Sequence, residues 1–271
     1  MKGGLKANGF TIIETLIVLA ISGSMLVAVV AMISGQQGKT QFQQSINQVS
    51  QQIQQIIGDV SNGYYPVSNI TCSASGSSVS IIPSNGSSSL GTNSDCVLVG
   101  KVIQFYQTQA SVPQQFTVYS MVGSRTGNGA YPIALAPGAN TYTNVPPGNT
   151  TVTSLANGLS LAYTTYTDSN GVTQTNTVAF GILTSPVSGS GATDTSGAQQ
   201  INIYAVQGTS ASADTNSNVD VIDKQPTNFV QITSYSVCLT SGTTNQSGLI
   251  TIGGGSRKVS VVLTIKDGKR C

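Results

Sequence analysis

Residues that carry out acid-base chemistry or bind catalytic metals are scarce in this chain. Its 271 residues include no His and no Trp, and Glu14 is the single Glu. Histidine is the most frequent general acid or base near neutral pH and a common ligand in metal hydrolases. Glu14 lies inside an apolar run, and no paired-carboxylate or activated-nucleophile motif occurs. We therefore expect that the protein is not an enzyme.

The four cysteines indicate disulfide chemistry instead. Cys72, Cys96, Cys238 and Cys271 form neither a Cys-x-x-Cys pair nor a zinc-binding spacing. An even number of cysteines in a chain with an export or membrane signal is typical of an oxidising compartment. Three connectivities are possible, and we favour the local pairs Cys72 with Cys96 and Cys238 with Cys271.

A polar segment of the C-terminal half resembles a calcium-binding loop in part. Its alternating oxygen side chains belong to Asp214, Asn216, Asn218, Asp220 and, further on, Asp223. Calcium loops alternate their ligands in this way, but Val219 stands where an EF-hand has glycine, and Gln225 replaces the bidentate Glu. A turn that satisfies its own backbone is the commoner interpretation of such a segment. Calcium is the one cofactor for which the sequence offers a candidate site; otherwise we expect none.

Basic residues gather at the C-terminus of a chain with a formal net charge of only +2. They are Arg257, Lys258, Lys266, Lys269 and Arg270. DNA is a candidate partner for such a cluster, although no aromatic residue for base stacking lies among them. Lysines that protect a solvated strand edge are the commoner explanation.

The N-terminal forty residues contain a segment long enough to cross a membrane. Lys2 and Lys6 precede an apolar run, Phe10 to Ile33, in which Glu14 is the only charge. As a helix this run is about 36 Å long, against about 30 Å for the hydrocarbon core of a bilayer. The lysines place the leader in the cytoplasm and the remainder outside.

Two other interpretations of this segment leave Glu14 unexplained. A cleaved secretory signal would end near Val29-Val30-Ala31, but the run is longer than a usual signal, and a charge near its start brings only a desolvation cost. An uncleaved signal anchor fits the length and meets the same difficulty.

The residues Gly9-Phe10-Thr11-Ile12-Ile13-Glu14, followed by a long apolar helix, resemble the prepilin motif of type IV pilins and type II secretion pseudopilins. The resemblance implies that a prepilin peptidase cleaves between Gly9 and Phe10 and that the new N-terminus is methylated. It also implies that Glu14 directs assembly, because a carboxylate buried among helices requires a positive partner. That partner would be the amine of Phe10 on a neighbouring subunit. Unlike many major pilins, the helix carries no Pro after its mid-membrane part.

Beyond Gly38 the chain continues as an amphipathic helix. Its apolar residues recur at alternating spacings of four and three: Phe42, Ile46, Val49, Ile53, Ile56 and Val60. This spacing produces one stripe, which we expect to pack against the chain's own head rather than form a coiled coil. Asn62-Gly63 ends the helix.

From Tyr64 onward the sequence predicts strands and turns. The strand candidates are 96–106, 116–122, 159–167, 177–183, 201–206, 229–239, 249–252 and 258–266. The first is apolar on both faces around Gly100 and indicates a central strand with a bulge. The last alternates as a half-exposed strand does. Ser/Gly-rich segments 73–94, 123–149 and 185–200 are predicted loops, and Asn-Gly pairs at 85, 128, 157 and 170 predict tight turns.

The head is also similar, over short motifs, to H-type minor pseudopilins and related minor pilins. The motifs are Gly100-Lys101-Val102-Ile103, within the strand candidate 96–105, and Gly248-Leu249-Ile250-Thr251-Ile252-Gly253 before Arg257. These motifs are mostly apolar, as plain strands are.

The sequence thus predicts an α+β protein, a long N-terminal helix on an antiparallel β-rich head. Its segments are a leader (1–9), a transmembrane and filament-core helix (10–34), an amphipathic helix (35–62) and an extracytoplasmic head (63–271). The expected role is a structural subunit, minor rather than major, of a type IV pilus. It would sit in the bacterial inner membrane as a single-pass precursor before entering the filament. Its partners would be other pilin subunits, the peptidase and the membrane. The alternatives are a type II secretion pseudopilin, or a minor pilin whose head binds DNA or a surface ligand.

Overall fold

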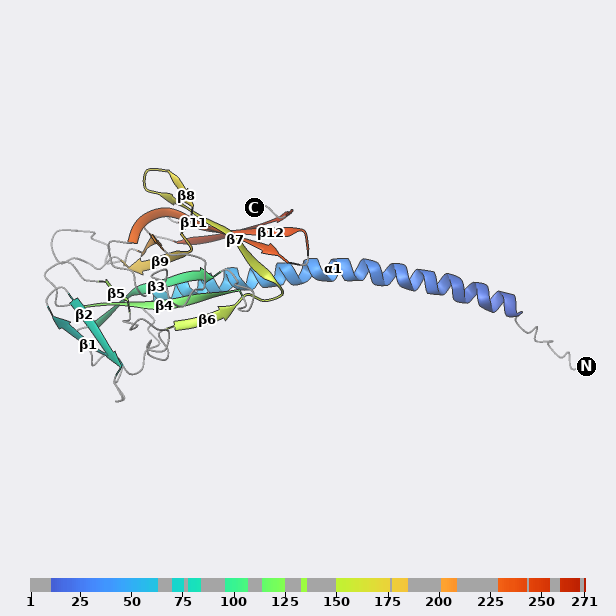
Figure 1. Ribbon diagram of the computed structural model, residues 1–271, viewed down its shortest axis with the longest axis horizontal. Helices are drawn as coiled ribbons and strands as arrows, with labels where there is room; N and C mark the ends of the chain where they lie inside the picture. Colours follow the sequence, from blue (N-terminus) through green and yellow to red (C-terminus); the bar gives the residue numbers. More distant parts are fainter. Residues whose placement is uncertain are drawn as a thin grey trace, which may run out of the picture. The chain divides into compact units, whose positions relative to one another are not determined.

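The computed structural model describes residues 11–62, 70–75, 78–83, 96–106, 114–124, 133–135, 150–175, 177–184, 201–208, 229–242, 244–253, 259–268 and 271. These residues form one long helix and thirteen strands, an α+β fold as predicted (Figure 1). The chain divides into two compact units, Met1–Gln41 and Phe42–Cys271. The boundary lies within the helix, seven residues beyond the predicted end of its transmembrane part.

Helix α1 covers Ile12–Ser61 without a break. The backbone N–H of Glu14 donates to the hydroxyl of Thr11 at 3.3 Å, which caps the first turn. At the other end the N–H of Asn62 donates to the carbonyl of Gly58 at 2.9 Å, and the helix stops there as Asn62-Gly63 predicts. No Pro interrupts the 50 residues, so the run of i to i−4 hydrogen bonds continues throughout.

In the Phe42–Cys271 unit, α1 supplies the centre of the hydrophobic core. All six residues of the predicted stripe are buried, and Ile57 is buried with them: Phe42, Ile46, Val49, Ile53, Ile56 and Val60. They pack with apolar side chains of the sheet in one cluster. The prediction that this stripe packs against the chain's own head is confirmed.

The sheet is antiparallel and runs in the order β13-β12-β11-β10-β9-β3-β4-β5, with β6 also paired to β4, and with β7 paired to β11 and β8. Its strands are β3 (Cys96–Tyr106), β4 (Gln115–Ser124), β5 (Ile133–Leu135), β6 (Thr150–Ser154), β7 (Leu159–Asp168), β8 (Thr173–Thr175), β9 (Ala179–Thr184), β10 (Ile201–Val206), β11 (Phe229–Ser241), β12 (Gln246–Gly253) and β13 (Ser260–Asp267). Strand β11 pairs along one edge with β10 at residues 229–232 and with β12 from residue 234 onward, and along its other edge with β7 from residue 232 onward. The sheet is curled, and its concave face contacts α1 (Figure 1).

Strand β3 is central, as its apolar sequence predicts. It pairs with β4 on one edge and β9 on the other, and the register shifts between Leu98 and Gly100, where the bulge was expected. A side chain at residue 100 would collide with the carbonyl oxygen of Ile182, so this site admits only glycine. Both faces are buried here: Ile103 and Phe105 belong to the cluster around α1, whereas Val102 belongs to a second cluster on the opposite face.

Aromatic contacts fill the core beneath β9 and β11. The rings of Phe180 and Tyr235 lie 4.6 Å apart, and the hydroxyl of Tyr235 donates to the carbonyl of Thr177 at 2.6 Å. Burial raises the pKa of Tyr235, an effect that the hydrogen bond with Thr164 partly opposes. This phenol is therefore a neutral core group.

Two predicted loops contain strands. Strands β1 (Ile70–Ser75) and β2 (Ser78–Pro83) pair as a separate antiparallel hairpin that overlaps the predicted loop 73–94, and β5 lies within the predicted loop 123–149. Their Ser-rich composition concealed a short alternation such as Ser78-Val79-Ser80-Ile81, which pairing with a neighbour is sufficient to order. The segment 185–200 lies outside the described residues.

Two of the predicted Asn-Gly turns are confirmed. Asn157 and Gly158 both have positive φ, 53° and 69°, and Leu159 N–H donates to the carbonyl of Ala156 at 3.1 Å. This is the geometry of a tight turn, and it joins β6 and β7, which pair with different strands. At the second turn Gly171 has φ 80°, and Asp168 accepts from its N–H at 3.1 Å. The pairs at 85 and 128 lie outside the described residues.

Candidate functional site

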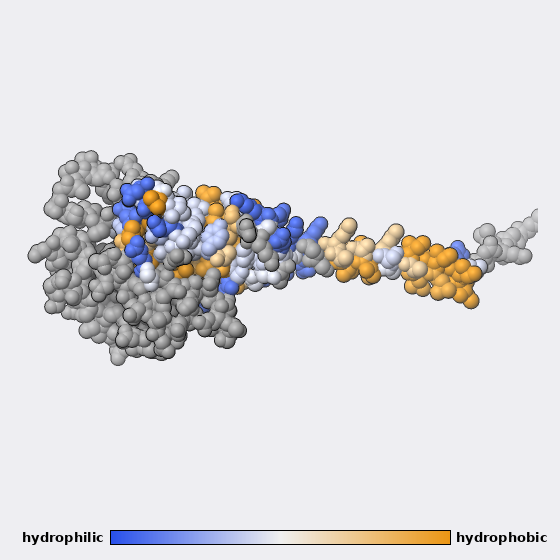
Figure 2. Space-filling view, turned by 45° about the horizontal axis from the view of Figure 1, so that its top comes forward, coloured by the Kyte–Doolittle hydropathy of each residue, from blue (hydrophilic) through white to orange (hydrophobic). Residues whose placement is uncertain are grey.

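The first half of α1 exposes an unusually large apolar surface. Between 52% and 80% of each large apolar side chain is exposed at residues 12, 13, 16–19, 21, 25–27, 29, 30, 32 and 33. Figure 2 shows much of this part of the helix in the colour of hydrophobic residues. Soluble monomers rarely leave apolar patches beyond a few hundred Å² in contact with water. This helix is long and apolar enough to cross a membrane.

The hydroxyl groups within this exposed half turn back onto the helix. Thr15, Ser22 and Ser24 donate to the carbonyls of Ile12, Val18 and Ile21 at 2.8, 2.7 and 2.8 Å. Such bonds satisfy a hydroxyl without water or another chain. These three hydroxyl side chains are therefore compatible with an apolar environment.

Glu14 is the one charged residue between Thr11 and Gly38. It occupies the third helical position, where a negative charge is stabilised by the positive end of the helix dipole. With Thr11 at the cap, Thr11-Ile12-Ile13-Glu14 has the spacing of a capping box. The Thr-x-x-Glu spacing is a signal that the sequence alone contains, although the prediction for Glu14 did not use it. It gives Glu14 a role in starting the helix, in addition to the exposed carboxylate that it presents.

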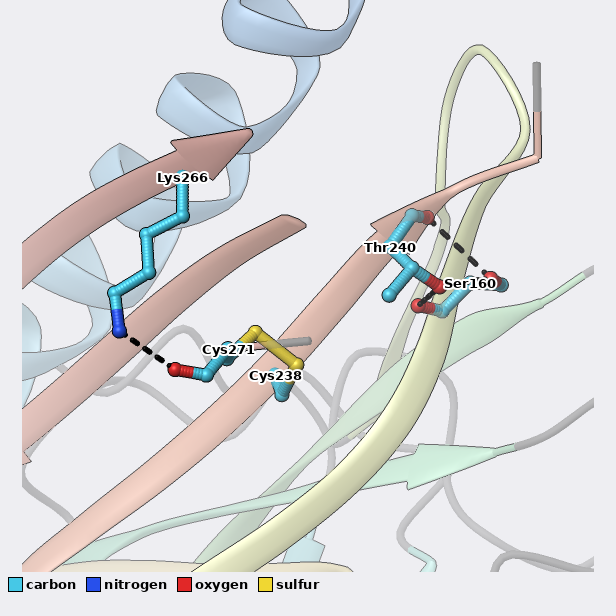
Figure 3. Close-up of a disulfide and its surroundings, with 5 residues drawn as sticks. All are labelled: Ser160, Cys238, Thr240, Lys266 and Cys271. Atoms are coloured by element: carbon cyan, nitrogen blue, oxygen red, sulfur yellow. Dashed lines mark hydrogen bonds between the residues drawn. A yellow bond between two sulfur atoms is a disulfide. The ribbon is translucent and has the colours of Figure 1, made fainter. Parts of the chain in front are cut away.

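The other predicted sites lie mostly outside the described residues. Gly9 and Phe10, the predicted cleavage junction, are among these. So are the calcium candidates, which are Asp214, Asn216, Asn218, Asp220 and Asp223. Of the basic cluster, Arg257, Lys258, Lys269 and Arg270 are also outside, and Lys266 is described. Its amine donates to the carbonyl of Cys271 at 2.8 Å (Figure 3).

The C-terminal disulfide is present as predicted. Cys238 and Cys271 are joined, with their Cα atoms 5.9 Å apart, and link β11 to residue 271 (Figure 3). Cys238 pairs with Leu249 of β12, on the sheet face away from α1, and is completely buried. Cys72 and Cys96 lie on β1 and β3, but their side chains are outside the described part, so that pairing stays a prediction.

Two polar contacts that hold α1 in the head were not apparent from the sequence. The amine of Lys101 on β3 lies 2.6 Å from the carboxylate of Asp59, near the end of the helix. The amide of Asn157, in the turn between β6 and β7, donates to the hydroxyl of Ser45 at 2.6 Å. These partners are 42 and 112 residues apart, a separation at which local patterns carry no signal.

Comparison with known proteins identifies no relative: no family model, no curated protein and no solved structure matches this chain. Its architecture is nevertheless pilin-like. A long apolar N-terminal helix packs on an antiparallel sheet, and a disulfide lies at the C-terminal end.

Proposed function

We propose that this chain is a structural subunit of a type IV pilus or a pilus-like filament, not an enzyme, and that it assembles through the first half of α1. One observation carries the proposal. The same unbroken helix is apolar and exposed over residues 12–33 and forms the centre of a β-rich head over residues 42–60. The second half of such a helix packs inside the head, and the first half is free to contact lipid or other helices.

The exposed half suits both environments that such a subunit would meet. In the bilayer its apolar side chains face lipid, and its hydroxyls are already satisfied by helix carbonyls. In a filament the same side chains would pack against helices of neighbouring copies. Moving from lipid to a helix bundle costs little, because both surroundings are apolar.

Glu14 is the residue to which we assign the assembly step. Before assembly its carboxylate lies in the first turn of α1, near the headgroups, and is stabilised by the helix dipole. Once neighbouring helices enclose it, a positive partner is required to offset its desolvation. The amine of Phe10 on an adjacent copy, freed by cleavage after Gly9, would be that partner.

The processing step is tested by mass spectrometry of the N-terminal peptide of the membrane-bound protein. We expect a chain that begins with methylated Phe10. A mature chain that begins at Met1 or Lys2, or one that begins after Ala31, would contradict the prepilin interpretation.

The assembly step is tested with Glu14→Val and, as a matched control, Thr15→Val. Glu14→Val should be processed and membrane-bound but poorly incorporated into sheared filaments, whereas Thr15→Val should assemble normally. Glu14→Asp keeps the charge with a shorter reach and should be intermediate. Wild-type amounts of Glu14→Val in filaments would overturn the assignment.

Labelling with gold-conjugated antibody distinguishes the kinds of filament. A subunit along the shaft of surface filaments is a major pilin, and one at a single end is a minor pilin. Absence from surface filaments would favour a type II secretion pseudopilin.

A further inference from the structure

Four strands of the head's sheet, β5, β6, β8 and β13, pair with a single neighbour in the described part of the chain. Within the described residues, β13 pairs only with β12, and β6 pairs only with β4. Strand β13 is first in the strand order, and β6 lies beside β4 near the other end, where β5 is the last strand. An open edge presents unpaired backbone N–H and carbonyl groups that can extend the sheet with another chain.

Most of each of these two edges lacks the devices that usually prevent such pairing, and the charged residues of β13 stand at its end. Charged side chains, Pro and short length are common protections. Residues 260–265 of β13 and all of β6 lack both charge and Pro. Lys266, at the end of β13, is hydrogen-bonded to Cys271 of its own chain. By contrast β5 and β8, the other two edge strands, have only three residues each.

Each edge also exposes a valine at its middle. Val262 of β13 is 56% exposed and Val152 of β6 is 54% exposed. They are two of the four large hydrophobic residues exposed in the described part of the Phe42–Cys271 unit, the others being Tyr163 and Val172. Each of these two edge strands thus carries one of the exposed hydrophobic side chains.

The two valines lie on the same face of the sheet. Val262 pairs with Thr251, and the flanking residues Ile250 and Ile252 point into the core around α1. Val152 pairs with Thr117, and the flanking residues Phe116 and Val118 point into that same core. Both valines therefore point away from α1. If β13 of one copy lay beside β6 of another, the faces would match and the two valines would meet.

We propose that the open edge of β13 in one copy pairs with the open edge of β6 in the next copy, so that neighbouring heads share a continuous sheet. The partner is a second copy of this chain, because the chain itself supplies both halves of the contact. Joining two different edges is a heterologous contact, which repeats in one direction and suits a filament. This inference rests on the proposed function and adds the contact between heads.

Charge substitutions in the full-length chain test the contact. Val262→Lys or Val152→Lys alone should lower the yield of sheared filaments about tenfold. This is the effect expected if the affinity of one contact between heads falls about tenfold. Val172→Lys is the matched control, since Val172 is 50% exposed but lies between β7 and β8. It should leave the yield unchanged. The double variant Val262→Lys, Val152→Asp should restore the yield, whereas a merely misfolded head would not be rescued.

Cross-linking within filaments identifies the partners. A filament that contains both Val152→Cys chains and Val262→Cys chains should give dimers with a short bis-maleimide reagent, and filaments of either chain alone should not. Normal filaments without mixed dimers, or dimers from Val262→Cys alone, would overturn the proposed contact while the assembly role of α1 still stands. If the wild-type chain enters no filament, the proposed function fails and this contact fails with it.

Discussion

The two halves of α1 belong to one unbroken helix but have opposite surroundings. In residues 12–33 nearly every position is apolar and exposed, whereas in residues 42–60 apolar positions form one stripe that is buried in the head. A helix that is apolar all round requires an apolar environment on every side, which a single sheet cannot provide. A helix with one stripe needs only one partner surface. The distribution of apolar residues thus indicates which half finds its partner within the chain.

Polar groups differ between the halves in the same way. In the exposed half, hydroxyls bond to carbonyls one turn earlier on the same helix. In the buried half, Ser45 and Asp59 contact Asn157 and Lys101 on other elements. In the first half the helix itself satisfies these hydroxyl groups, and only Glu14 requires an outside partner. In the second half Ser45 and Asp59 bond to specific residues of other elements. Four predictions test this contrast.

The largest effect is expected for a truncation in the buried stripe. Ile53→Ala should reduce the free energy of unfolding of the head by about 2–5 kcal/mol, because Ile53 is fully buried and the loss leaves a cavity. The matched substitution Ile17→Ala, at an exposed position, should change it by less than about 0.5 kcal/mol. Urea unfolding of the full chain in detergent, followed by near-ultraviolet circular dichroism, measures both. Equal losses would contradict the division between the halves.

The ion pair at the end of α1 should have the next largest effect. Asp59→Asn should cost about 1–3 kcal/mol, because it leaves the buried amine of Lys101 without its carboxylate. The double variant Asp59→Asn, Lys101→Met removes the orphaned charge as well and should recover part of the loss. The same urea unfolding assay measures the free energy of unfolding of the single and the double variant. A double variant less stable than Asp59→Asn would show that the amine has another stabilising role.

A close approach between helix and sheet provides the third test. A side chain at residue 248 would collide with the end of the Ile46 side chain, so Gly248→Ala should cost about 1–3 kcal/mol. Gly253→Ala, on the same strand, meets only ordinary contacts and serves as the control. Adding Ile46→Val to Gly248→Ala removes the colliding carbon and should restore much of the stability. A double-mutant cycle from the unfolding assay quantifies this coupling.

The smallest effect is expected at the turn that contacts α1. Asn157→Gly keeps the positive φ of 53° accessible but loses the hydrogen bond to Ser45, at a cost of about 0.5–1.5 kcal/mol. Asn157→Ala should cost about 1–2 kcal/mol more, since alanine is disfavoured in this left-handed conformation. If the two variants are equally stable, the backbone conformation of the turn contributes nothing measurable.

Several elements were predictable because their cause is local. The stripe from Phe42 to Val60 follows from the helical period, the strand from Cys96 to Tyr106 from apolar residues on both of its faces, and the turn at Asn157-Gly158 from two residues that tolerate positive φ. The hairpin of β1 and β2 was missed because its alternation is short and interrupted by Ser. Its two strands are defined by each other more than by either segment alone.

By itself, the sequence determined the continuous helix, which of its faces needs an internal partner, the set of central strands and the position of Glu14 near the helix start. Only the tertiary structure decided that Lys101 meets Asp59, that Ile46 packs against Gly248, and that β13 and β6 are edge strands with exposed valines on one face of the sheet. The physical reason is distance along the chain. Periodicity and turn chemistry act over a few residues, whereas strand order and side-chain pairing depend on which distant segments the folded backbone brings into register.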